Sequence, residues 1–85
     1  MKNSIDIKQL LNVFNKVTRE GVKKEDRYVL NQIVAWTDFD GYTCFMEYKD
    51  IKITIYFHNK YHVEAPNERS LEAFEELIDK MARVH

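Results

Sequence analysis

The fold is decided by residues 33–57, which read IVAWTDFDGYTCFMEYKDIKITIYF. β-Branched and aromatic residues dominate this stretch, and much of it alternates between apolar and polar side chains, which is typical of β-strands. Asp40-Gly41 is a strong signal for a two-residue hairpin loop, and Lys49-Asp50 separates the next two runs. Connections this short join antiparallel strands. The stretch therefore predicts three strands, at residues 32–39, 42–48 and 51–57.

The residues before this stretch predict a helix followed by a connector. Apolar residues recur at spacings of three and four and predict a helix over residues 3–19, which Asn3 can cap. Gly21 follows at the place where helices often end in a left-handed residue. Residues 22–27 are mostly charged and predict a connector, and residues 28–30 predict a short strand.

The residues after this stretch predict one more strand and a second helix. Residues 61–64 predict a short strand, which Pro66 ends. Asn67 or Ser70 can then cap a helix over residues 67–83, whose apolar residues form one stripe. The predicted order of elements is helix, antiparallel strands, helix.

A chain of 85 residues has room for a single domain, residues 1–85. The expected fold class is α+β, in which two helices lie on one face of an antiparallel meander of three to five strands. Apolar residues make up 45% of the chain and charged residues 32%, a composition typical of soluble globular proteins. No apolar run is long enough to span a membrane, and no apolar signal region follows Met1, so we expect a cytoplasmic protein.

The hairpins determine which side chains share a face of the sheet. With Asp40-Gly41 as the loop, Ala35 lies opposite Met46, and residues directly opposite each other share a face. With Lys49-Asp50 as the loop, Met46 lies opposite Ile53. The face toward the helices is then predicted to carry Ile33, Ala35, Phe39, Cys44, Met46, Ile51, Ile53, Ile55 and Phe57.

The opposite face is predicted to expose a group of three aromatic side chains. Trp36 lies opposite Phe45, and Tyr56 lies diagonal to Phe45. An exposed apolar patch of roughly several hundred Å² is near the largest that monomeric proteins leave open to water. We therefore predict an interaction surface on this face, and its other predicted members are Val34, Asp38, Thr54 and His58.

Three kinds of partner could cover this surface. A second copy of the chain could form a homodimer, or an unidentified protein could bind with Trp36 as its anchor. Single-stranded nucleic acid could stack its bases on the rings. The net charge of −1 argues against binding of nucleic acid. Lys52 is also the one basic residue that is expected beside the rings, which is too little positive charge to attract phosphate groups. Two other arrangements leave no such surface: a helix crosses to this side, or the first hairpin slips by one residue and buries Trp36.

Residues with catalytic or metal-binding chemistry are few. The register turns the single Cys44 toward the helices, so we expect a buried side chain and not a nucleophile. Two isolated glycines cannot form a phosphate-binding loop. We therefore predict a non-enzymatic protein without a cofactor or a metal site. The weak candidates for metal ligands, whose spacing matches no metal motif, are Asp38, Asp40, His58 and His62.

Two segments resemble a family of small bacterial proteins of unknown function: residues 35–43, AWTDFDGYT, and residues 57–62, FHNKYH. The likeness extends over nearly the whole chain. It implies a stand-alone intracellular bacterial protein and carries no assigned activity, cofactor or catalytic residue. Together, the residues predict a module that associates through its aromatic sheet face, with itself or another protein; the alternative is weak binding of single-stranded nucleic acid.

Overall fold

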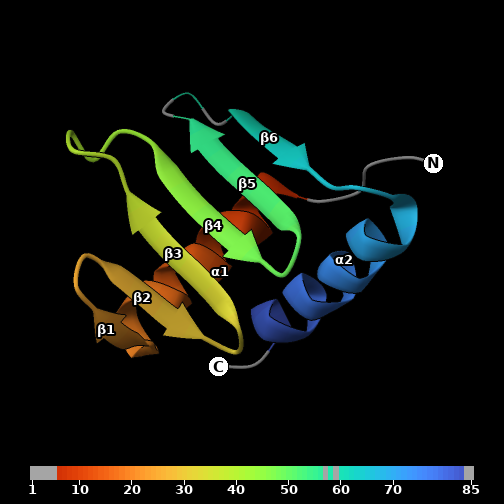
Figure 1. The fold of residues 1–85 in the computed structure, drawn as a ribbon, viewed down its shortest axis with the longest axis horizontal. Helices are drawn as coiled ribbons and strands as arrows, with labels where there is room; N and C mark the ends of the chain where they lie inside the picture. Colours follow the sequence, from red (N-terminus) through yellow and green to blue (C-terminus); the bar gives the residue numbers. More distant parts are fainter. Residues whose placement is uncertain (1–5, 57, 59, 84–85) are drawn as a thin grey trace.

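A computed structural model describes residues 6–56, 58 and 60–83 of the chain (Figure 1). Six strands form one antiparallel sheet in which the strands are neighbours in chain order. Within the described ranges, neither helix is long and apolar enough to cross a membrane. The elements are α1 (Ile7–Glu20), β1 (Val22–Lys24), β2 (Arg27–Leu30), β3 (Ile33–Thr37), β4 (Cys44–Tyr48), β5 (Ile51–Tyr56), β6 (Lys60–Glu64) and α2 (Glu68–Arg83).

The α+β class is confirmed, with six strands instead of the expected three to five. The short segments predicted at residues 28–30 and 61–64 both belong to the sheet, as parts of β2 and β6. The predicted connector over residues 22–27 is wrong, because β1 pairs with β2 across a tight turn at Glu25 and Asp26. All three residues of β1 are exposed. An exposed edge strand needs no apolar alternation, so its sequence gave no strand signal.

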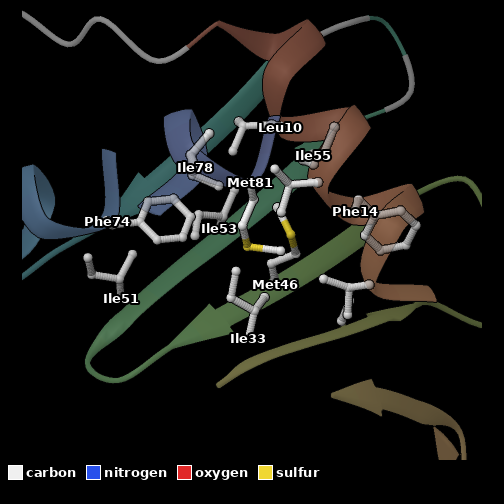
Figure 2. Packing of buried hydrophobic residues seen from close by; sticks show 13 residues of the cluster. Leu10, Phe14, Ile33, Met46, Ile51, Ile53, Ile55, Phe74, Ile78 and Met81 are labelled. Carbon is white, nitrogen blue, oxygen red and sulfur yellow. The ribbon is translucent and has the colours of Figure 1, made fainter. Parts of the chain in front are cut away.

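The predicted register of the central strands is confirmed. Ala35 pairs with Met46, and Met46 pairs with Ile53. Both helices cover the same face, since their buried residues join those of β3, β4 and β5 in one cluster. Figure 2 shows Leu10 of α1 and Phe74 of α2 packed in this cluster with residues of the strands. The buried apolar residues are Leu10, Val13, Phe14, Val17, Ile33, Ala35, Met46, Ile51, Ile53, Ile55, Phe74, Ile78 and Met81.

Two predicted core residues have a different outcome. Phe57 lies outside the described residues. Phe39 is fully exposed, so its assignment to the core is wrong. The loop of the first hairpin has four residues instead of two, because the amide of Asp38 donates to the carbonyl of Thr43 at 3.0 Å. The carboxylate of Asp38 also accepts a hydrogen bond from the amide of Gly41 at 2.8 Å. The turn is therefore closed at Asp38 and Thr43, and Phe39 and Tyr42 lie in the loop instead of in the strands. Both loop lengths are even, so the register of the strands is unchanged.

The ends of the helices are set by side-chain caps. Asp6 caps α1 by accepting from the amide of Lys8 at 3.1 Å, whereas the predicted cap Asn3 lies outside the described residues. Asn67 accepts from the amide of Ser70 at 2.8 Å, which confirms it as the cap of α2.

Gly21 ends α1, but the left-handed conformation predicted for it is wrong. Its φ is −75° and its backbone is extended. The glycine is required for space: an added Cβ would lie 2.5 Å from the carbonyl oxygen of Val17 and 2.7 Å from that of Val29. Gly21 therefore lets the end of α1 lie directly against β2.

We expect Gly21→Ala to destabilise the fold by about 3 kcal/mol, the upper end of overpacking effects, because backbone oxygens cannot move aside as side chains can. Urea denaturation would measure this free energy. Gly41→Ala is the matched control: Gly41 has a φ of 78° and open space around it, so the cost there should be about 1 kcal/mol of backbone strain. An equal loss at both positions would contradict the close approach at Gly21.

Candidate interaction surface

The sheet face turned away from both helices, here called the outer face, extends over all six strands. Residues of neighbouring strands that pair with one another share this face. Its described members are Val22, Lys24, Arg27, Val29, Val34, Trp36, Phe45, Glu47, Lys52, Thr54, Tyr56, Lys60, His62 and Glu64.

Three side chains from adjacent strands stack on one another at the centre of the outer face. The rings of Trp36 and Phe45 are stacked, with their centroids 5.3 Å apart and their planes 20° from parallel. The guanidinium carbon of Arg27 lies 4.0 Å from the centroid of the Trp36 ring. Because β2 and β4 flank β3, Arg27 and Phe45 cover opposite faces of the indole. We call Arg27, Trp36 and Phe45 the stacked ladder.

The stacked ladder is held by two ring contacts and remains partly open to solvent. Trp36 and Phe45 are both half-buried. An aromatic pair in this geometry contributes about 0.5–1.5 kcal/mol beyond the burial of its area, and a cation over an indole adds to it. Both interactions restrict the rotamers of the side chains. A partner that covers the ladder would thus meet side chains that have little conformational entropy left to lose.

Three exposed aromatic residues of the described part of the chain lie outside the ladder, one on β5 and two in the loop between β3 and β4. Tyr56 is 47% exposed at the end of β5. Cys44 pairs with Ile55, so the loop between β3 and β4 ends beside Tyr56. Phe39 and Tyr42 in this loop are both exposed. Sequence reasoning missed these two residues because the Asp40-Gly41 signal assigned them to strands.

The outer face carries charges of both signs around the ladder. The Nζ atom of Lys52 lies 3.9 Å from Oε2 of Glu47, and Nε2 of His62 lies 3.6 Å from Oε2 of Glu64. Lys24, Arg27 and Lys60 join Lys52 on this face because β1, β2 and β6 belong to the sheet. The expectation that only Lys52 accompanies the rings is therefore wrong. The sequence did not predict β1, because its charged residues are typical of a connector.

The remaining predicted surface residues occupy different positions. Val34 and Thr54 lie half-buried on the outer face. Asp38 accepts hydrogen bonds from the amides of Gly41 and Thr43 at the hairpin turn. His58 lies exposed in the connection between β5 and β6.

The four weak candidates for metal ligands are not brought together. Asp38 holds the hairpin turn, Asp40 is exposed in the loop, and His62 lies on the outer face beside Glu64. Residues 6–56, 58 and 60–83 contain no group of three or more histidine, cysteine or acidic side chains that could hold a metal ion.

Cys44 is half-buried against the core. Burial raises the pKa of its thiol, and the negative charge of Asp38 raises it further. The thiolate is the nucleophilic form of cysteine, so this environment suppresses reactivity near neutral pH.

We expect Cys44 to react with iodoacetamide more slowly in the native protein than in denaturant, and its rate to rise only at a higher pH. Asp38→Asn can still accept the hydrogen bonds of the turn but removes the charge, so the native rate should increase. Mass spectrometry of the alkylated protein would measure both rates. Equal rates in native and unfolded protein at neutral pH would contradict this account of Cys44.

The comparison with protein families confirms the resemblance to a family of unknown function. The match extends over residues 5–85 and thus includes both helices and the whole sheet. Neither a curated protein nor a solved structure matches the chain. The chain belongs to the family described as Protein of unknown function (DUF3081).

Proposed function

We propose that this protein is a small non-enzymatic interaction module that associates through its outer face, with a second copy of itself or with another protein. The observation that carries the proposal is the stacked ladder of Arg27, Trp36 and Phe45, which lies on the sheet face that neither helix covers. The proposal assigns the module to the bacterial cytoplasm, as the resemblance of residues 35–43 and 57–62 implies.

The composition of the outer face is that of a binding surface. Tryptophan, tyrosine and arginine are the residues that most often dominate the energy of protein interfaces. Arg27 stacks on Trp36, and Tyr56 lies on the same face, two strands away from Trp36. Half-buried rings at the centre with charged residues around them match the usual arrangement of an apolar core and a polar rim. Trp36 is the expected anchor, because its two neighbours already hold it in place.

A second copy of the chain is the partner that this surface fits best. A twofold dimer requires a self-complementary surface, and the outer face offers cations such as Lys52 and Lys60 together with anions such as Glu47 and Glu64. Six strands spaced at about 4.8 Å, each about five residues long, span roughly 400 Å² in projection. Stable interfaces bury about 800 Å² on each partner, so the dimer should be weak.

Self-association should appear at high micromolar concentration and depend on the outer face. We expect sedimentation velocity to show a shift from monomer toward dimer as the concentration rises. Trp36→Ala and Tyr56→Ala should each weaken the shift, whereas Trp36→Phe should retain most of it because it keeps a stacked ring. Circular dichroism would verify that each variant is folded.

Glu72→Ala, an exposed change on α2, is the matched control and should leave self-association unaltered. A protein that stays monomeric up to near-millimolar concentration would eliminate the dimer. Dimers that persist unchanged in both Trp36→Ala and Tyr56→Ala would show that association uses another surface.

Single-stranded nucleic acid is a second candidate, favoured by one observation. Four cationic side chains, those of Lys24, Arg27, Lys52 and Lys60, share the outer face with the stacked rings. Aromatic rings in a cationic groove bind single strands without sequence preference, and each stacked base contributes about 1–3 kcal/mol. Glu47 and Glu64 oppose phosphate on the same face, which favours a protein partner over this one.

The nucleic-acid candidate predicts that oligothymidylate quenches the fluorescence of Trp36 at low salt. Affinity should fall as salt rises, because binding releases counterions. Lys24→Gln and Lys60→Gln should weaken binding and reduce the salt dependence, while Lys8→Gln on α1 should have little effect. An unchanged Trp36 signal at the lowest salt concentration would remove this candidate.

A further inference from the structure

A pocket of about 580 Å³ opens on the helix side of the sheet, away from the outer face. It lies between the second half of α1 and the last turns of α2, beside the turn that joins β2 to β3; Figure 1 shows α2 ending near this turn. Its volume falls within the range of about 300–1,000 Å³ that is typical of small-molecule sites. Nothing in the proposed association through the outer face requires this pocket.

The inner part of the pocket is apolar. Leu30 and Tyr48 from the sheet and Leu77 and Met81 from α2 line it. Leu30, Tyr48 and Leu77 are only half-buried, while Met81 is 5% exposed. Three partly exposed apolar side chains that gather in one concavity offer a hydrocarbon body an environment that excludes water. Met81 can adapt its shape to such a body, because methionine is flexible and polarizable.

The rim of the pocket is polar and carries a positive excess. Lys16 from α1 and Lys80 from α2 supply two positive charges, and Glu20 supplies one negative charge. A single anionic group on the ligand would neutralise the one excess positive charge of this rim, whereas a dianion would leave an excess negative charge. The two lysines come from different helices and line the same pocket.

The turn at the rim contains an unfavourable residue. Asn31 and Gln32 have φ values of 52° and 70°, the pattern of a type I′ turn. Asparagine is well suited to the first position and glycine to the second, whereas a glutamine there strains the backbone. Gln32 thus places an amide side chain on the pocket where glycine would make the turn easier to form. Backbone strain of this kind tends to occur at binding sites.

From these four features we propose that the pocket binds a monoanionic amphiphile, specifically a carboxylic acid with a hydrocarbon body. The hydrocarbon lies against Tyr48 and Leu77. The carboxylate lies at the rim, where it accepts hydrogen bonds from the ammonium group of Lys80 and from the side-chain amide of Gln32. The ligand class follows from the combination of an apolar interior, a rim with one excess positive charge, and amide donors.

The test uses isotope-labelled protein and three ten-carbon probes that differ in charge: decanoate, decan-1-ol and decylammonium. We expect decanoate to cause saturable shifts in amide NMR signals, confined to residues around the pocket such as Asn31, Leu77 and Lys80. Decylammonium should bind at least about tenfold more weakly, because the rim repels it. An equal response to the three probes, or shifts centred on Trp36, would overturn the proposal.

Two variants separate ligand binding from folding. Gln32→Gly should leave the thermal midpoint of unfolding unchanged or raise it, because it relieves strain in the turn, yet it should weaken decanoate binding several-fold. Lys80→Gln should weaken decanoate binding about tenfold, the equivalent of one charge-assisted hydrogen bond. Lys52→Gln, on the outer face, is the control and should change nothing. Decanoate binding that is unaltered in both Gln32→Gly and Lys80→Gln would contradict the proposed site.

Discussion

The pairing of β4 with β5 is the constraint on which the rest of the structure depends. The tight turn at Lys49 and Asp50 fixes Tyr48 opposite Ile51, although it holds Lys49 at a φ of 56°. Since side chains alternate along a strand, this one pairing decides which residues of the sheet meet the helices. A slip of one residue would turn Lys52 toward the core, with nothing in the apolar cluster to balance its charge.

The same alternation gives the sheet two faces with different side chains. The face toward the helices holds aliphatic residues that pack with Leu10 and Phe74 into a core without a buried polar or charged side chain among the described residues. The outer face holds the stacked ladder, whose rings need partners on neighbouring strands to stay in place. Where the helices leave part of their own side uncovered, beside Tyr48, the pocket forms. The core, the outer face and the pocket are thus consequences of one register.

The central sheet could be predicted from the sequence because its signals are local. Ile51, Ile53 and Ile55 alternate strictly, and their periodicity fixes the face of every residue that pairs with them. Two other features depend on distant contacts. Arg27 stacks on Trp36 only because β2 joins the sheet, and its strand signal is short. The pocket depends on where α2 ends relative to α1, which no local pattern encodes. Phe39 was wrongly assigned because the side chain of Asp38 competes for the amides of the loop.

Quenching of tryptophan fluorescence by acrylamide tests the central claim most directly, because Trp36 is the only tryptophan in the chain. In dilute protein, where any dimer has dissociated, quenching of the half-buried indole should be intermediate between that of free tryptophan and that of a fully buried side chain. Protection should then increase as the protein is concentrated and the outer face is covered. An indole as inaccessible in dilute protein as in a protein core would contradict the register and remove the outer face as a binding surface.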